Sequence, residues 1–231
     1  MKKLILSTAI VLLSAGAFAQ TMSGSSGRVG VKAGVNLARM HYSGQGSAAL
    51  NDVTKDNVGY NLTLFGDFGV GNNFFIQPGI SLQNKGTKLD GSITAGGNTF
   101  TGTNTVNVMA IEVPINAIVR IPTGDAGALQ VSAGPYVGFN ISGKSKTEVT
   151  SGSSNLGSSE SDLKFGNSNN DDISSTDFGA NFGLAYRMNS GFTLGANYGL
   201  GLTNLVPKDK QANNDTKALN RVLGFSVGYS F

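Results

Sequence analysis

The chain contains no cysteine and no tryptophan, and it has a single histidine, His41. Without cysteine it can form no disulfide, and one histidine without a thiol is no credible ligand set for zinc. Charged residues make up only 13% of the chain and the basic ones are dispersed, so the composition gives no support for nucleic-acid binding. No phosphate-binding glycine motif is present, and we expect no cofactor.

The one long apolar run lies at the N-terminus, in MKKLILSTAIVLLSAGAFAQ. Two lysines precede an apolar core over residues 4–13, and Ala-Phe-Ala at 17–19 forms a small-x-small cleavage site. We therefore predict a secretory signal peptide over residues 1–19 and a mature barrel domain over residues 20–231. A membrane anchor is the alternative, but the core is shorter than the ~20 residues that a spanning helix needs. Loss of the two lysines lowers the formal net charge from +3 to +1.

The C-terminal segment RVLGFSVGYSF, residues 221–231, alternates large apolar residues with glycine and serine. Alternation is a strand pattern, because successive side chains of a strand point to opposite faces. A fully paired terminal strand with an outward apolar face is typical of a closed barrel in lipid. We predict that its aromatic end is a signal for membrane insertion, carried by Phe225, Val227, Tyr229 and Phe231.

Seven further segments repeat this alternation, and each is long enough to cross a bilayer as a tilted strand. They comprise residues 28–38, 57–70, 73–83, 105–121, 128–141, 177–188 and 192–202. Glycine is abundant, at 33 residues, as suits a β protein. The chain is therefore predicted to be all-β, an eight-stranded antiparallel up-and-down transmembrane β-barrel.

Short turns alternate with long polar loops between these strands. The turns are rich in glycine, asparagine and proline and lie at residues 71–72, 122–127 and 189–191. The loops lie near residues 39–56, 84–104, 142–176 and 203–219. This asymmetry is typical of an outer-membrane barrel with periplasmic turns and external loops. A soluble barrel of the lipocalin type is the alternative, but its inward face would be apolar.

Three prolines, Pro78, Pro114 and Pro135, lie inside predicted strands. Proline is normally confined to sheet edges or bulges because it has no N–H to donate, and a closed barrel has no edge. We therefore expect a local bulge or lost hydrogen bonds at these positions.

With the apolar faces outward, the opposite faces turn polar side chains into a narrow interior. The charged members form a predicted lumen charge network: Lys32, Asp67, Glu112, Arg120 and Arg187. Because buried charges must pair, we predict that Lys32 and Asp67, near the periplasmic ends of adjacent strands, face each other. Arg120 and Arg187 are expected near the periplasmic rim. Glu112 is expected near mid-height, where it needs a partner from another strand.

This interior has two interpretations. One is a satisfied polar core that excludes ions, and the other is a narrow, gated path for small solutes, for which polar lining alone is weak evidence. Its carboxylates become candidates for acid–base catalysis only if they are unpaired.

A hydrolytic site would need His41 beside a nucleophile and an acid. Ser43, Ser47 and Asp52 are near in sequence, but no strand pattern holds them in place. In the third loop, residues 167–172 offer oxygen atoms but lack the ordered spacing of a calcium loop. We predict no metal, and we expect residues 142–176 to form a mobile polar surface loop.

Five segments carry a resemblance to a known family. They are IEVPINAIVR (111–120), GPYVGFNISGK (134–144), DFGANFGLAYR (177–187), YGLGLTNL (198–205) and RVLGFSVGYSF (221–231). In combination they resemble strands of the PorT-like outer-membrane β-barrel family over almost the whole mature chain. The sequence departs from that pattern at Ala110 and Phe139, where the family often has an aromatic residue and a tyrosine. The resemblance implies an eight-stranded barrel in the outer membrane and little about activity.

Together these features predict a monomeric protein of the cell outer membrane. We expect it to be no enzyme and to have a structural or surface-interaction role through its external loops. The alternatives are a narrow small-solute pore and, third, a membrane-embedded lipid-modifying enzyme. The expected partners are outer-membrane lipids, the barrel-assembly machinery and an unidentified extracellular ligand of the loops.

Overall fold

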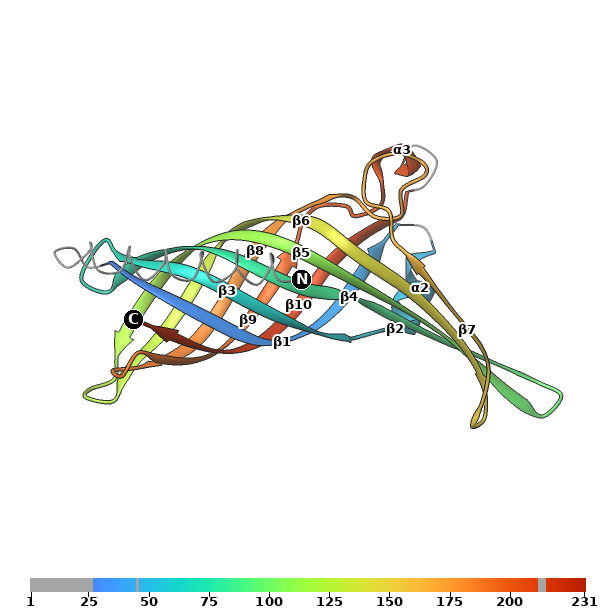
Figure 1. The fold of residues 1–231 in the computed structure, drawn as a ribbon, viewed down its shortest axis with the longest axis horizontal. Coiled ribbons are helices and arrows are strands. Elements are labelled where there is room, and N and C mark those ends of the chain that lie inside the picture. Colours follow the sequence, from blue (N-terminus) through green and yellow to red (C-terminus); the bar gives the residue numbers. More distant parts are fainter. Residues whose placement is uncertain (1–26, 45, 212–214) are drawn as a thin grey trace, which may run out of the picture.

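Eight strands close into an antiparallel barrel in the computed structural model, which describes residues 27–44, 46–211 and 215–231 (Figure 1). The barrel strands are β1 (Gly27–Ser43), β3 (Asn57–Gly69), β4 (Phe74–Ala95), β5 (Asn98–Pro122), β6 (Gly127–Ser151), β8 (Thr176–Met188), β9 (Phe192–Gly201) and β10 (Lys217–Ser230). Each pairs with the barrel strand before and after it, and β10 pairs with β1 to close the ring. The predicted fold class is therefore confirmed. The predicted signal peptide lies outside the described residues.

Side chains of the barrel wall alternate between an exposed apolar face and a buried polar face. On β3, for example, the outward Val58 is 68% exposed and the inward Asn61 only 7%. The same contrast holds between Ile80 and Ser81 on β4. A continuous apolar outer surface of this kind is stable in lipid rather than in water, so the wall has the polarity expected of a transmembrane barrel.

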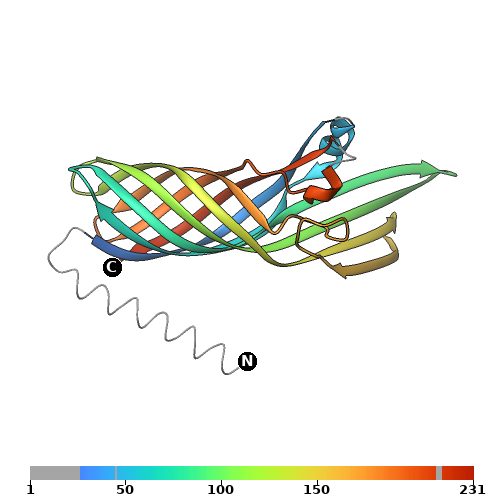
Figure 2. The ribbon, with the colours of Figure 1, turned by 90° about the horizontal axis from the view of Figure 1, so that it is seen from above.

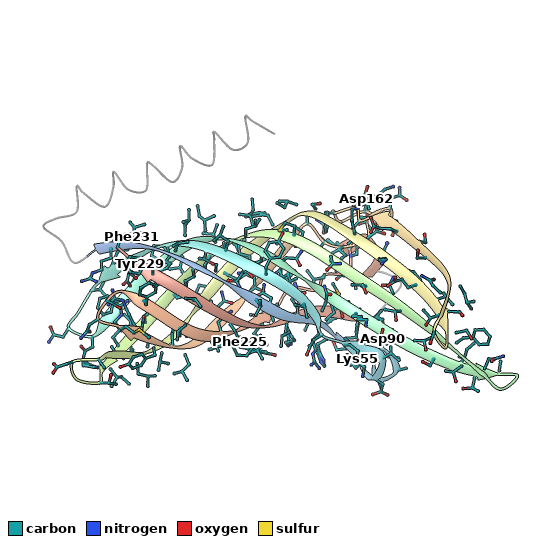
Figure 3. All side chains as sticks on the ribbon, turned by 60° about the horizontal axis from the view of Figure 1, so that its bottom comes forward. Lys55, Asp90, Asp162, Phe225, Tyr229 and Phe231 are labelled. Atoms are coloured by element: carbon teal, nitrogen blue, oxygen red, sulfur yellow. The ribbon has the colours of Figure 1, made fainter. Side chains whose placement is uncertain are left out.

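The two ends of the barrel differ as the spacing of turns and loops predicts. Short turns join β3 to β4, β5 to β6 and β8 to β9 at the end where the C-terminus lies (Figure 1). Figure 3 places Tyr229 and Phe231 at that end, and Lys55, Asp90 and Asp162 at the other. In an outer-membrane barrel the short turns face the periplasm, so the long segments lie outside.

Two of the predicted loops are largely strands. Residues 84–104 continue β4 and β5 as a paired hairpin that turns at Gly96 and Gly97, both with positive φ. Within 142–176, β6 continues to Ser151 and pairs with an additional strand, β7 (Ser154–Asp162). Most side chains of these segments are polar, but their threonine, valine and isoleucine residues favour strand pairing. Figure 2 shows both hairpins projecting beyond the barrel.

The remaining external segments contain short elements. The β1–β3 connection holds α2 (Ser47–Val53) and β2 (Thr54–Lys55), and the β9–β10 connection holds α3 (Lys208–Gln211). No helix in the described part of the chain has the length and apolar character needed to span a bilayer.

The prolines interrupt pairing without shifting the register. In the β3–β4 pairing, Phe65 pairs with Gly79 and Phe68 with Ile76, on either side of Pro78. The two β4 positions between them, Gln77 and Pro78, have no partner on β3, but the alignment of the two strands is unchanged. The β5–β6 pairing has a similar gap at Pro135, and the β4–β5 pairing has one at Pro114, again without a change of alignment. Of the two expected outcomes, lost pairing is therefore observed at these prolines, whereas the β5–β6 register shift lies elsewhere, between Met109 and Ala110.

The seam between β1 and β10 depends on a glycine. A Cβ atom at Gly34 would overlap the carbonyl oxygen of Phe225 and lie 2.8 Å from the Cα atom of Ser226. We predict that Gly34→Ala lowers the free energy of unfolding by about 1–3 kcal/mol, because the seam must open to accept the methyl group. Urea titration of the refolded protein measures this.

A matched control is Gly91→Ala on the β4–β5 hairpin, where an added Cβ meets nothing within 4 Å. It is expected to unfold like the unmodified chain. Equal unfolding midpoints for the two variants would contradict the proposed seam constraint.

Candidate functional site

Lys85 on β4 is the centre of a buried ionic cluster in the outer half of the lumen. Its Nζ donates hydrogen bonds to Glu112 on β5 and, at 2.9 Å, to Oδ2 of Asp177 on β8. The Tyr136 hydroxyl of β6 and the Asn220 amide of β10 donate to the same Asp177 oxygen, at 3.2 and 2.8 Å. The Lys85 and Asp177 side chains are 3% and 0% exposed. The cluster thus joins side chains from β4, β5, β6, β8 and β10.

Packing around this cluster leaves little free space. Lys85 Nζ lies 5.3 Å from the centre of the Tyr136 ring, so the cation also faces an aromatic surface. Gly179 on the neighbouring strand makes room for that ring, since a Cβ there would lie 2.5 Å from it. The polar atoms are therefore held in place by close packing as well as by charge.

A layer of neutral polar side chains lies on the periplasmic side of the Lys85 cluster. Asn36 donates to Gln83 Oε1 at 2.8 Å, and Asn61 donates to Asn36 Oδ1 at the same distance. The hydroxyl groups of Thr63 and Ser81 lie 2.6 Å apart. Asn36, Asn61, Thr63 and Ser81 are all at most 7% exposed, so these bonds satisfy polar groups that are shielded from bulk solvent.

The periplasmic half of the lumen holds a second ion pair, between Arg120 and Asp67. The Arg120 guanidinium also donates to Gln130 and stacks 3.7 Å from the centre of the Phe75 ring. Lys32 instead donates to Gln77 at 2.9 Å. Lys32 and Asp67, predicted to face each other, form no ion pair in the described part of the chain, because Arg120 binds the carboxylate from β5, two strands along the sheet from β3.

Arg187, like Lys32, has no carboxylate partner in the described part of the chain. Its Nε and Nη2 atoms are buried and have no hydrogen-bond partner among the described residues. It borders a cavity of about 120 Å³ that Lys32, Glu112 and Arg120 also line. A polar cavity of this size holds several water molecules, and water is the natural partner for the free guanidinium atoms.

An apolar layer lies directly outward of the Lys85 cluster. Its buried members are Met40, Val108, Ile173, Leu205 and Ala218. Ala218 is the next inward residue of β10 beyond Asn220 toward the outer end of the barrel. Ile173 and Leu205 come instead from the external β7–β8 and β9–β10 connections. Backbone hydrogen bonds of 2.8 Å join Ser174 to Leu205 and Leu205 to Ala218. We call these five buried residues the apolar lid.

The predicted charge network is thus divided between two clusters. Asp67 and Arg120 meet in the periplasmic half, and Glu112 finds its partner in Lys85. The sequence pattern assigns no role to Lys85 or Asp177, because it places Lys85 in a predicted loop and Asp177 at the start of a predicted strand. The alternation Ser81, Gln83, Lys85, Thr87 is the signal that extends the inward face of β4 far enough to include Lys85.

The sequence matches the model of one protein family, described as the outer membrane protein beta-barrel domain, over residues 18–206. The chain belongs to this family. The protein is therefore an integral β-barrel of the cell outer membrane. The finer resemblance to PorT-like barrels stays a prediction. No curated protein matches the sequence.

Solved structures of small outer-membrane barrels are similar to this family member. Ail, the attachment invasion locus protein of Yersinia pestis, is 15% identical, with 89% of this chain and 99% of Ail covered and a TM-score of 0.37. Neisserial surface protein A is 14% identical, with coverages of 88% and 97% and a TM-score of 0.42. The N-terminal barrel domain of Pseudomonas aeruginosa OprF is 12% identical, with coverages of 89% and 100% and a TM-score of 0.33.

No described part of this outer-membrane barrel groups three or more histidine, cysteine or acidic side chains around a common point for a metal ion. In the 167–172 segment the Asp171 carboxylate instead accepts hydrogen bonds from the amide and hydroxyl of Ser168. The hydroxyl bond is the main cause of a lowered pKa for Asp171. His41 lies on the outer surface, where it borders a shallow hollow with Arg39 and Arg221.

Proposed function

We propose that this outer-membrane barrel is a non-enzymatic surface protein, which acts through the hairpins formed by β4–β5 and β6–β7 outside the membrane. The main support is the contrast between the lumen of the barrel and the external hairpins. The lumen holds two clusters of paired charges beneath the apolar lid, whereas the hairpins continue the sheet into the external medium (Figure 2). Asp67 and Glu112 are both paired, so the condition for acid–base catalysis is not met.

The hairpins offer surface for a partner. On the β4–β5 hairpin, Ile93 is 70% exposed and pairs across the turn with Phe100. Leu156 on β7 is 56% exposed. Within the described chain β7 pairs only with β6, so its second edge presents free backbone groups. Exposed apolar side chains beside an open strand edge favour contact with another macromolecule.

Conductance distinguishes this proposal from the pore alternative, which the 120 Å³ cavity favours. The refolded mature protein is expected to be silent in a planar bilayer, because the Lys85 cluster and the apolar lid leave ions no hydrated path. A Glu112→Ala variant is expected to show at most brief openings. Discrete, stable channel steps in the unmodified protein would establish the pore instead.

Truncation tests the external role. Leu89 pairs with Asn104, so residues 90–103 are replaceable by an Asn-Gly turn that preserves the register of the remaining hairpin. Cells that display the truncated protein are expected to bind less to immobilised cells and matrix proteins than cells that display the full hairpin. Shortening the periplasmic turn at residues 123–126 is the matched control. Unchanged binding by the truncated form at equal surface density would refute the hairpin role.

A further inference from the structure

Basic residues appear on the outward faces of β1 and β10 at the outer end of the barrel, where on β10 Arg221 and Lys217 flank Leu219. On β1 the outward positions from Val29 to Leu37 are apolar, and Arg39 and His41 follow. A tilted strand needs about 9–11 residues to cross the hydrocarbon core. Arg39 and His41 therefore lie where the membrane meets the external medium. They mark the level of the lipid headgroups.

Arg221 occupies the same level on β10. It lies directly opposite Arg39 in the register, with Lys217 further outward on the same face. Like charges placed opposite each other destabilise a sheet unless an anion compensates them. Asp56 compensates Arg39, with hydrogen bonds of 2.6 and 2.9 Å.

Arg221 has no such partner. Its Nη1 donates at 2.8 Å to the backbone carbonyl groups of Gly201 and Asn220. These bonds orient the guanidinium without neutralising its charge, and no carboxylate of the described chain forms a salt bridge with it. A charged and oriented guanidinium at the membrane surface is therefore available for an anion.

A surface hollow of about 430 Å³ lies beside this arginine. His41, Asp56 and the two arginines form its polar lining, and Leu37, Tyr198 and Leu223 form its apolar lining. The apolar part continues the lipid-facing surface of the barrel, because Leu37 and Leu223 are paired on its outward face. A tyrosine is also typical of the interfacial belt. The hollow thus spans the boundary between acyl chains and headgroups.

We propose that this hollow binds the phosphate group of a phosphorylated lipid in the outer leaflet of the outer membrane. Arginine matches phosphate because its planar guanidinium donates two parallel hydrogen bonds. Arg221 is the main anchor, and the apolar lining contacts the acyl chains. The proposal rests on the membrane location of the barrel and is independent of the hairpin role.

The test uses the refolded protein in nanodiscs of a phosphate-free glycolipid, digalactosyldiacylglycerol, with diphosphoryl lipid A as the probe and its phosphate-free form as the comparison. Arg221→Gln is expected to weaken the binding of lipid A roughly tenfold, because a charge-assisted contact is lost. Lys144→Gln, which removes the same unit of charge from the exposed β6–β7 hairpin, is expected to bind like the unmodified protein.

Asp56→Asn is expected to change the affinity for lipid A in the opposite direction to Arg221→Gln. It removes the carboxylate that neutralises Arg39, so it is expected to tighten lipid A binding. This variant keeps the proposal testable even if Arg221→Gln fails to fold. Excess inorganic phosphate is expected not to displace the lipid, because it lacks the acyl chains.

Three results would each overturn the proposal. They are equal affinity for lipid A with and without phosphate, unchanged or weaker binding by Asp56→Asn, and displacement of the lipid by inorganic phosphate. The last result would show a site for free phosphate rather than for a lipid. Neither the conductance nor the hairpin experiment bears on these outcomes, so this proposal fails or stands separately.

Discussion

Replacing Lys85 with methionine is expected to lower the free energy of unfolding by about 3–5 kcal/mol. The substitution removes the only cation that contacts Glu112 and Asp177 in the described lumen and leaves two carboxylates whose side chains are only 8% and 0% exposed. Methionine is close to lysine in length, so lost packing contributes little. The cost arises because an uncompensated buried charge loses its hydration without gaining a partner.

Urea titration measures this change in the free energy of unfolding. Circular dichroism is the signal to follow, because the chain has no tryptophan whose fluorescence could report unfolding. Lys144→Met is the matched control. Lys144 pairs with Glu160 as Lys85 pairs with Glu112, but both side chains are at least half exposed, and such pairs contribute little to stability. An unfolding midpoint of Lys85→Met equal to that of the control would refute the stabilising role of the cluster.

A triple variant identifies the cause of the loss. Combining Lys85→Met with Glu112→Gln and Asp177→Asn removes the carboxylates that the single change leaves uncompensated. Replacement of a whole buried ionic group is often close to neutral, so most of the lost stability is expected to return. If the triple variant is as unstable as the single one, packing rather than charge explains the defect.

The sequence was sufficient to predict the barrel because its wall repeats one simple pattern. Outward Val58 and inward Asn61 alternate on β3 as Phe225 and Ser226 alternate on β10, and closure requires nothing beyond pairing each strand with its neighbours. The outer ends of β4, β5 and β6 are harder to predict from the sequence. Beyond the membrane both strand faces meet water, so the apolar alternation that marks a strand within lipid disappears.

Pairing inside the lumen could not be read from the sequence for a different reason. Two inward charges meet only if the tilt and stagger of the strands bring them to the same height, and sequence separation gives neither. Lys32 and Asp67 lie on adjacent strands, yet Arg120 reaches Asp67 from β5. The apolar lid is also difficult to predict, because two of its residues, Ile173 and Leu205, belong to external connections that are polar as a whole. These connections fold back over the lumen to pack against Met40, Val108 and Ala218.

Deleting Phe231 is expected to prevent most of the protein from assembling in the outer membrane. Its amide donates at 2.8 Å to the carbonyl group of Val29, so the last residue still takes part in closing the barrel. Its ring is 68% exposed and lies edge-on to Tyr229, with 5.1 Å between centres, and Tyr229 makes the same contact with Phe192 at 5.0 Å. Figure 3 shows Phe231 and Tyr229 together at the periplasmic end. This aromatic group is a structural contact, and we expect its exposed side also to be recognised by the assembly machinery.

Comparing cells with purified protein separates these two roles. If Phe231 is mainly a recognition signal, the shortened chain refolds in detergent with normal yield but accumulates outside the membrane in cells. Phe139→Ala is the control, because it removes a lipid-facing ring that is 47% exposed but distant from the terminus, and it is expected to assemble normally. Normal insertion of the shortened chain in cells would refute the insertion signal, whereas a parallel loss of refolding yield would assign Phe231 to barrel closure alone.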